Sequence, residues 1–157
     1  MTRRSSTLDA RRAERIGYVA DQLLPHAAVV TRLLVKQVDG DISRTEAGVL
    51  STLIAAPRRI TELAELEGLA QPTMTLLIQR LEQRGWVKRE RRAHDARVVL
   101  VSPTEAGSAT LEKFRAQVGA ALRVHMDAMS DEQVAALETA TEALGSLVDT
   151  FVSGTAT

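Results

Sequence analysis

Apolar residues recur in steps of three and four near the start of the chain, which is the period of an amphipathic helix. The pattern runs from about Asp9 to Val38, and its apolar positions are Ile16, Val19, Ala20, Leu23, Ala27, Val30 and Leu34. It predicts one long helix that is kinked at Pro25, because proline lacks a backbone N–H and crowds the preceding turn. The segment Asp39-Gly40-Asp41 is predicted to end the helix in a turn.

The next apolar stretch begins with a capping signal. Ser43 and Glu46 are three residues apart, so each side chain can satisfy a free backbone N–H of the other at the start of a helix. Val49, Leu50 and Leu53 continue the pattern, and we expect the helix to stop near Ala56-Pro57. A short helix is predicted at residues 61–67, followed by a turn at Gly68-Leu69-Ala70.

A further helix is predicted from Gln71 to Arg84. Pro72 lies in its first turn, where a missing N–H costs nothing, and Gly85 suits a left-handed helix cap. The apolar positions predict a buried face that consists of Met74, Leu77, Ile78 and Leu81. Residues 86–90 and 97–101 then have the composition of two strands, and residues 91–96 form the charged tip of a hairpin between them.

Two amphipathic helices are predicted to complete the chain. The first starts at Ser102-Pro103-Thr104-Glu105 and extends to about Ala128. The second is capped by Ser130 and Gln133, which have the spacing of another capping box. Along it, alternating steps of three and four join Val134, Leu137, Thr141, Leu144, Val148 and Phe151. We expect both ends of the chain to be frayed; for the Arg-rich N-terminus, a nucleic-acid-binding arm is the alternative.

The net charge of zero conceals an uneven distribution. Residues 71–97 contain seven Lys and Arg against three Asp and Glu, whereas residues 98–157 contain three against eight. A basic middle beside an acidic end is typical of a protein with one surface that faces a polyanion. Because nucleic-acid binding draws on local phosphate neutralisation, this distribution matters more than the total charge.

Other classes of function find no support in the sequence. There is no cysteine, which excludes disulfides and thiol chemistry and favours a reducing, cytoplasmic setting. There is no apolar run of membrane-spanning length, no catalytic motif and no Gly-rich phosphate loop. The three histidines lack metal-ligand spacing. We therefore expect neither an enzyme, nor a bound metal or cofactor, nor a membrane protein.

The order of the middle elements favours DNA binding. A short helix, a glycine turn, a second helix and a basic hairpin together are the winged form of the helix-turn-helix. A helix in the major groove can read base edges with Gln, Arg and Thr. On the predicted helix after the turn, the candidate DNA-binding residues are Gln71, Pro72, Thr73, Thr75, Gln79 and Arg80. On the wing and its flanks they are the basic residues Arg84, Lys88, Arg91, Arg92 and Arg97. Taken singly, each of these side chains is equally consistent with a solvated surface.

Residues 43–107 resemble the MarR family of bacterial transcriptional regulators. The similarity lies in the segments Ile60–Ala64, Gln71–Thr75 and Leu81–Val87, in the Asp95-Ala96-Arg97 signature of the wing, and in the segment Ser102–Gly107 that follows it. The resemblance implies a mainly α fold with a small β-hairpin wing, a winged helix-turn-helix flanked by long dimerisation helices. It also implies that Arg97 enters the minor groove while Asp95 holds its guanidinium in place.

The resemblance carries over to organisation and partners. It implies a dimerisation helix in residues 1–40, the DNA-binding module in residues 41–102 and dimerisation helices in residues 103–157. The partners would be double-stranded DNA with a pseudo-palindromic operator, a second copy of the chain, and a small aromatic effector. Candidate residues for the effector pocket are His26, Val30, Leu50 and Phe114.

These expectations lead to one functional hypothesis with two alternatives. The hypothesis is a repressor of adjacent genes that a small ligand relieves. The alternatives are a winged-helix module for protein–protein contact and an activator without ligand control. A protein-contact surface is expected to expose apolar or aromatic anchors.

Overall fold

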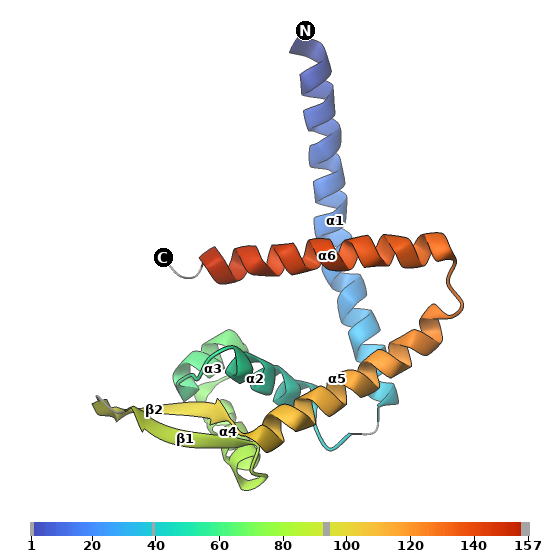
Figure 1. The fold of residues 1–157 in the computed structure, drawn as a ribbon. Coiled ribbons are helices and arrows are strands. Elements are labelled where there is room, and N and C mark those ends of the chain that lie inside the picture. Colours follow the sequence, from blue (N-terminus) through green and yellow to red (C-terminus); the bar gives the residue numbers. More distant parts are fainter. Residues whose placement is uncertain (1, 39, 93–94, 155–157) are drawn as a thin grey trace. The chain divides into compact units, whose positions relative to one another are not determined.

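The computed structural model describes the backbone of residues 2–38, 40–92 and 95–154, and the side chains of residues 9–38, 40–91 and 98–151. Within these ranges the fold consists of six helices and one two-stranded antiparallel sheet (Figure 1). The elements are α1 (Thr2–Gln37), α2 (Arg44–Ala55), α3 (Ile60–Leu66), α4 (Gln71–Gln83), β1 (Val87–Arg92), β2 (Asp95–Pro103), α5 (Glu105–Met126) and α6 (Asp131–Gly154). The expected fold class, mainly α with a small hairpin, is confirmed. None of the helices in the described ranges is both long and apolar enough to cross a membrane.

The helix starts follow the capping signals of the sequence. At α2, Glu46 N donates to Ser43 Oγ over 3.2 Å, and Ser43 N donates to Glu46 Oε2 over 2.7 Å. Ser130 and Gln133 form the same reciprocal pair before α6, at 3.3 and 3.0 Å. Both predicted capping boxes are therefore present, and each supplies acceptors for backbone N–H groups that the first helical turn leaves free.

The first helix differs from the expectation at its N-terminal end. α1 begins at Thr2 rather than near Asp9, so the backbone that was expected to fray is helical. As predicted, one helix runs through Pro25, and the kink expected there stays a prediction. A run of residues without Gly or Pro before Gly17 favours this extension, because nothing in it breaks the helical backbone.

The hydrophobic core lies between α2, α3, α4, the hairpin and the start of α5. Its fully buried members come from elements far apart in the sequence; the largest are Leu50, Leu53, Leu63, Met74, Ile78, Leu81 and Leu111. The predicted buried face of α4 is confirmed in full, since Met74, Leu77, Ile78 and Leu81 are all buried. This core fixes α4 by one face and leaves its other face to solvent.

The hairpin is attached to this core through its base. Arg89 pairs with Val101 in the β1–β2 ladder, and Arg58 pairs with the same Val101 on the other side of β2. In this second pairing, Arg58 N donates to Val101 O over 3.1 Å and Val101 N donates to Arg58 O over 2.8 Å. The chain divides into two compact units, residues 1–118 and residues 119–157, and the whole winged module lies in the first.

Candidate nucleic-acid interface

Two glycines set the geometry of the helix-turn-helix. Gly68 and Gly85 have φ angles of 63° and 71°, a conformation that glycine adopts without steric cost. After α3, Gly68 N donates to Glu65 O and Leu69 N to Ala64 O. After α4, Gly85 N donates to Glu82 O and Trp86 N to Leu81 O. Both helices thus end in a Schellman motif, which stops the helix and fixes the direction of the chain that follows.

The exposed face of α4 has the chemistry expected for reading DNA. The exposed side chains on it include five of the six predicted residues, Gln71, Pro72, Thr73, Gln79 and Arg80. Thr75 is half-buried, and its hydroxyl donates to Gln71 O over 2.9 Å, so its oxygen keeps only acceptor capacity for a partner. A helix held by one face and polar on the other can present amide and guanidinium groups to base edges.

Sequence reasoning missed one residue on this face. Leu76 is 62% exposed, three positions after Thr73 and three before Gln79. These spacings place it in the middle of the polar face. A large apolar side chain there matches the one apolar group of the major groove, the methyl of thymine. The sequence did contain a sign of this, because Leu76 lies outside the buried stripe that Met74, Leu77 and Leu81 define.

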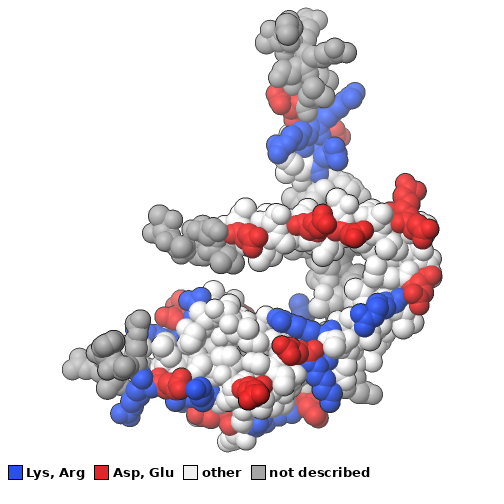
Figure 2. Space-filling view, viewed as in Figure 1, with Lys and Arg blue, Asp and Glu red and all other residues white. Residues whose placement is uncertain are grey.

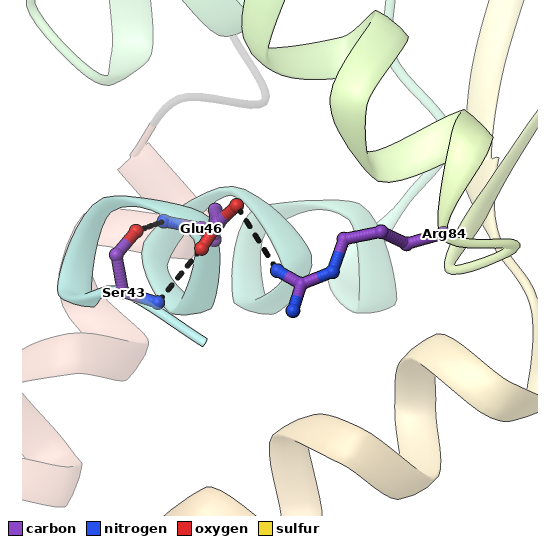
Figure 3. A network of polar contacts seen from close by, with 3 residues as sticks. All are labelled: Ser43, Glu46 and Arg84. Atoms are coloured by element: carbon purple, nitrogen blue, oxygen red, sulfur yellow. Dashed lines mark hydrogen bonds and ion pairs between the residues drawn. The ribbon is translucent and has the colours of Figure 1, made fainter. Parts of the chain in front are cut away.

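Arg84 is engaged within the protein. Its Nη1 lies 3.5 Å from Oε1 of Glu46, whose side chain is 5% exposed, and its guanidinium lies 3.8 Å from the centre of the Trp86 ring. Figure 3 shows the other carboxylate oxygen of Glu46 bound to Ser43 at the start of α2. This pair joins the end of α4 to the start of α2. The charge of Arg84 is therefore compensated by a nearly buried carboxylate, and its guanidinium packs on a ring of the same chain.

The cationic side chains of the hairpin differ in whether a nearby carboxylate offsets their charge. Lys88 Nζ lies 2.7 Å from Glu90 Oε1, and Arg89 Nε lies 3.1 Å from Glu82 Oε2. The hydrogen bond from Lys88, and after it that from the Ser102 hydroxyl, holds the pKa of Glu90 below its usual value, so this glutamate is anionic at neutral pH. Arg91 is exposed and has no ion pair among the described side chains.

The remaining wing residues of the prediction are Arg92, Asp95 and Arg97. Their backbone belongs to the two strands, with Arg92 opposite Asp95 in the register. Their side chains lie outside the described residues. The ion pair expected between Asp95 and Arg97 therefore stays a prediction.

The start of α5 is locked onto the turn that follows α4. Thr104 Oγ1 donates to Gly85 O over 2.6 Å and accepts from Gly107 N over 3.1 Å, while Thr104 N donates to Trp86 O over 3.0 Å. A Cβ at Gly107 would lie far inside van der Waals distance of the Trp86 carbonyl. The close approach of α5 to this turn thus requires glycine at position 107.

An open cavity of about 560 Å³ lies beside this junction. Its lining includes the only tryptophan of the chain and one of its two phenylalanines; the residues are Gly40, Asp41, Ile42, Trp86, Thr110, Lys113, Phe114 and Gln117. Two aromatic rings with one ammonium, one carboxylate and two amide or hydroxyl groups suit a small, partly aromatic ligand that also carries polar groups. The cavity touches Trp86, the residue on which the Arg84 guanidinium stacks.

The structure separates the four residues of the predicted effector pocket. Phe114 lines the cavity, whereas Leu50 is fully buried in the core. His26 and Val30 are exposed on α1. His26 lines a shallow groove along that helix instead, together with Tyr18, Val19, Gln22 and Leu23.

The long helices expose apolar side chains that the chain does not cover. On α1 these include Ile16, Val19, Leu24, Val30 and Leu33, and on α6 Val134, Leu137, Leu144, Val148 and Phe151. On α6 these residues are three, four or seven positions apart and so lie along one face of the helix. Apolar side chains left exposed along long helices are typical of a helix–helix interface with another chain.

Comparison with known proteins agrees with this geometry. A sequence model of the MarR family matches residues 42–99. An uncharacterised HTH-type transcriptional regulator of Bacillus subtilis, YpoP, is 25% identical over 128 residues, which cover 76% of this chain and 91% of the relative.

Solved structures give the same fold. The transcriptional regulator Tm0710 of Thermotoga maritima is similar with a TM-score of 0.64 and 20% identity, over 89% of this chain and 98% of that one. The multiple antibiotic resistance repressor MarR is similar with a TM-score of 0.59 and 25% identity, over 83% of this chain and 93% of that one.

Proposed function

Because this chain belongs to the MarR family of transcriptional regulators, we propose that it is a homodimer that binds a pseudo-palindromic operator. In this proposal the bound dimer represses adjacent genes, and a small ligand relieves the repression. The observation that carries the DNA-binding part is the exposed polar face of α4, held from behind by four buried residues and flanked by a cationic hairpin. The repressor part draws on the similarity to a protein that is itself a repressor.

In this proposal, α4 is the recognition helix and enters the major groove. Gln79 and Arg80 read base edges, and Leu76 contacts a thymine methyl group. Gln71 and Thr73 lie in the first turn, where free backbone N–H groups favour a phosphate. Because the buried face of α4 is packed against the core, the exposed side chains of this helix are held in place and do not depend on a flexible loop.

The hairpin is the wing that lies along the neighbouring groove. Arg91 and Arg92 neutralise phosphates, and Lys88 contributes less because Glu90 offsets its charge. Arg97 enters the minor groove and is oriented by Asp95, as the family resemblance implies; a narrow, A·T-rich groove favours such an arginine.

The dimer forms through the exposed apolar faces of α1 and α6. Leaving these faces in water costs free energy that association recovers. A closed twofold dimer presents two recognition helices to half-sites about one helical turn apart, which requires an operator with matching symmetry.

The effector binds in the cavity beside Trp86 and Phe114. A ligand that binds one dimer geometry more tightly shifts the population toward it. If the favoured geometry spaces the two recognition helices wrongly for successive grooves, DNA is released. Because Trp86 is the only tryptophan, its fluorescence is a direct probe: titration with phenol or benzoate should change it, and Phe114→Ala should weaken that response.

A winged-helix module for protein–protein contact is the second candidate. Two leucines favour it, since Leu66 on α3 and Leu76 on α4 are 61% and 62% exposed. Each is a single apolar residue among polar neighbours, whereas protein interfaces gather several anchors at one centre.

The deciding experiment measures binding to the DNA upstream of the protein's own gene by fluorescence anisotropy. The variant Gln79→Ala/Arg80→Ala should lose about tenfold or more in affinity, because each removed base contact is worth roughly 1–3 kcal/mol. Arg123→Ala, which removes an exposed cation outside the winged module, is the control and should bind like the wild type. A wild type that does not distinguish this DNA from random duplex would reject the proposal and favour protein contact.

A further inference from the structure

One apolar side chain lies at an outward position in the middle of α4. Leu76 is the sixth of the 13 residues of this helix, and its side chain is 62% exposed. At about 100° per residue, it lies roughly opposite the four buried residues that fix α4 to the core. A side chain at this place points into any groove that the exposed face of α4 enters, so its chemistry bears on which DNA is bound.

The neighbours of Leu76 on this face are polar or cationic. Thr73 and Gln79 lie three positions before and after it, and Arg80 lies four positions after it. Arg80 is exposed and has no ion pair among the described side chains. Figure 2 shows cations on the winged module and a row of acids along α6, a helix that contains no Lys or Arg. The surroundings of Leu76 therefore suit a polyanion.

A protein partner fits this face less well. All side chains of α4 are described, and Leu76 is the only large exposed apolar residue among them. Protein interfaces gather several large anchors at one centre, whereas a single apolar group among hydrogen-bonding side chains matches the mixed chemistry of a base edge.

The major groove offers one kind of apolar group to such a side chain, the methyl group at C5 of a pyrimidine. Thymine carries this methyl group, and unmodified cytosine has only a hydrogen atom there. In 5-methylcytosine the same methyl group stands on the same carbon, and the hydrogen-bonding pattern of the base pair is unchanged. A leucine can detect the difference, because covering a methyl group with apolar surface is favourable.

Arg80 limits where along the DNA this contact falls. Side chains four positions apart on a helix have Cβ atoms about 5–6 Å apart. Successive base pairs are about 3.4 Å apart along the duplex. When Arg80 bonds to the O6 and N7 atoms of a guanine, Leu76 therefore meets the pyrimidine of the same base pair or of a neighbouring one.

We propose that Leu76 reads the C5-methyl group of a pyrimidine beside the guanine that Arg80 contacts. The protein then distinguishes thymine and 5-methylcytosine from unmodified cytosine at that position. The inference rests on the proposed DNA binding by α4 and adds a sensitivity to cytosine methylation. Methylation of a cytosine at the contacted position strengthens binding, so the regulator responds to the modification state of its operator.

The first measurement compares the DNA upstream of the protein's own gene with the same DNA in which uracil replaces every thymine. The replacement removes the methyl groups and leaves base pairing unchanged. Wild-type affinity, measured by fluorescence anisotropy, should fall about fourfold for each contacted methyl group. Leu76→Ala should bind both DNAs about equally. Leu66→Ala shortens a leucine of nearly equal exposure, 61%, on α3, so it is the matched control and should respond like the wild type.

The decisive measurement changes a single methyl group. Replacing the thymines of a half-site by uracil one at a time locates the contact. Synthetic operators with cytosine or 5-methylcytosine opposite guanine at that position then differ only in the methyl group. The wild type should bind the methylated operator about fourfold more tightly for each half-site. Leu76→Met should keep this preference, and Leu76→Asn, which is similar in size but polar, should lose it.

Three results would contradict the proposal in different ways. Equal affinity of the wild type for the methylated and unmethylated operators would overturn it and leave DNA binding intact. An equal loss on uracil-containing DNA for wild type and Leu76→Ala would overturn it too, because the methyl groups would then act through the shape of the duplex. A wild type that does not distinguish its upstream DNA from random duplex would overturn the proposed function as well.

Discussion

Glu46 makes two polar contacts, with Ser43 and with Arg84, and only the first could be predicted from the sequence. The capping box with Ser43 is readable because its members are three residues apart. The ion pair with Arg84 spans 38 positions and leaves no local pattern. For this reason the sequence predicted Arg84 as a DNA contact, whereas the structure places its guanidinium against Glu46 and the Trp86 ring.

Removing the Arg84 cation should therefore destabilise the fold. Arg84→Met leaves the carboxylate of Glu46, with a side chain only 5% exposed, without its counter-charge. We expect a loss of about 1–2 kcal/mol in the free energy of unfolding, less than for a fully buried pair because Arg84 is partly solvated. Arg59→Met removes the exposed pair with Glu62, 3.9 Å apart, and should change stability by less than about 0.5 kcal/mol. Equal urea midpoints for the two variants would contradict this account.

At the scale of elements, the connection between α4 and α5 depends on a glycine. Gly107→Ala would drive a Cβ into the Trp86 carbonyl, which the bonds from Thr104 hold in place. We expect a loss of about 3 kcal/mol, the range for overpacking against backbone that cannot yield. Gly17→Ala on α1 meets nothing within 4 Å and should instead gain about 0.5–1 kcal/mol. Thermal unfolding of both variants measures the contrast, and a Gly107→Ala variant as stable as the wild type would show that α5 can shift.

The hairpin provides a prediction about charge compensation within an element. Glu90 is held anionic by Lys88 and Ser102, and it offsets the Lys88 ammonium on the strand. Glu90→Gln removes the negative charge and frees Lys88 for a phosphate, so DNA affinity should rise about threefold at low salt. Glu112→Gln on α5 makes the same chemical change on an exposed residue outside the hairpin and should have no effect. A fall in DNA affinity for Glu90→Gln would mean that Glu90 helps to position the wing and does not weaken its binding to DNA.

Over the whole molecule, the features that could be predicted from the sequence are those set by periodic patterns or by residues close together in the chain. The buried face of α4, the two capping boxes and the glycine turns all follow from spacings within a few residues. The cavity could not be predicted, because Gly40, Trp86 and Phe114 meet only through the fold. Leu76 was missed for a different reason: an apolar residue on a polar face contradicts the rule by which apolar residues are assigned to the core.

The symmetry of the proposed complex can be read from the salt dependence of DNA binding. Each phosphate that a cation neutralises contributes about 0.9 to the slope of log K against log salt concentration. Arg91 is exposed and unpaired among the described side chains, so a symmetric dimer uses it twice, and Arg91→Ala should lower the slope by about 1.8. Leu76→Ala should leave the slope unchanged but reduce the preference for A·T pairs that it contacts. Anisotropy titrations over a range of salt concentrations measure both. A slope change near 0.9 for Arg91→Ala would mean that one wing alone binds, which contradicts a twofold complex even if the affinity falls as expected.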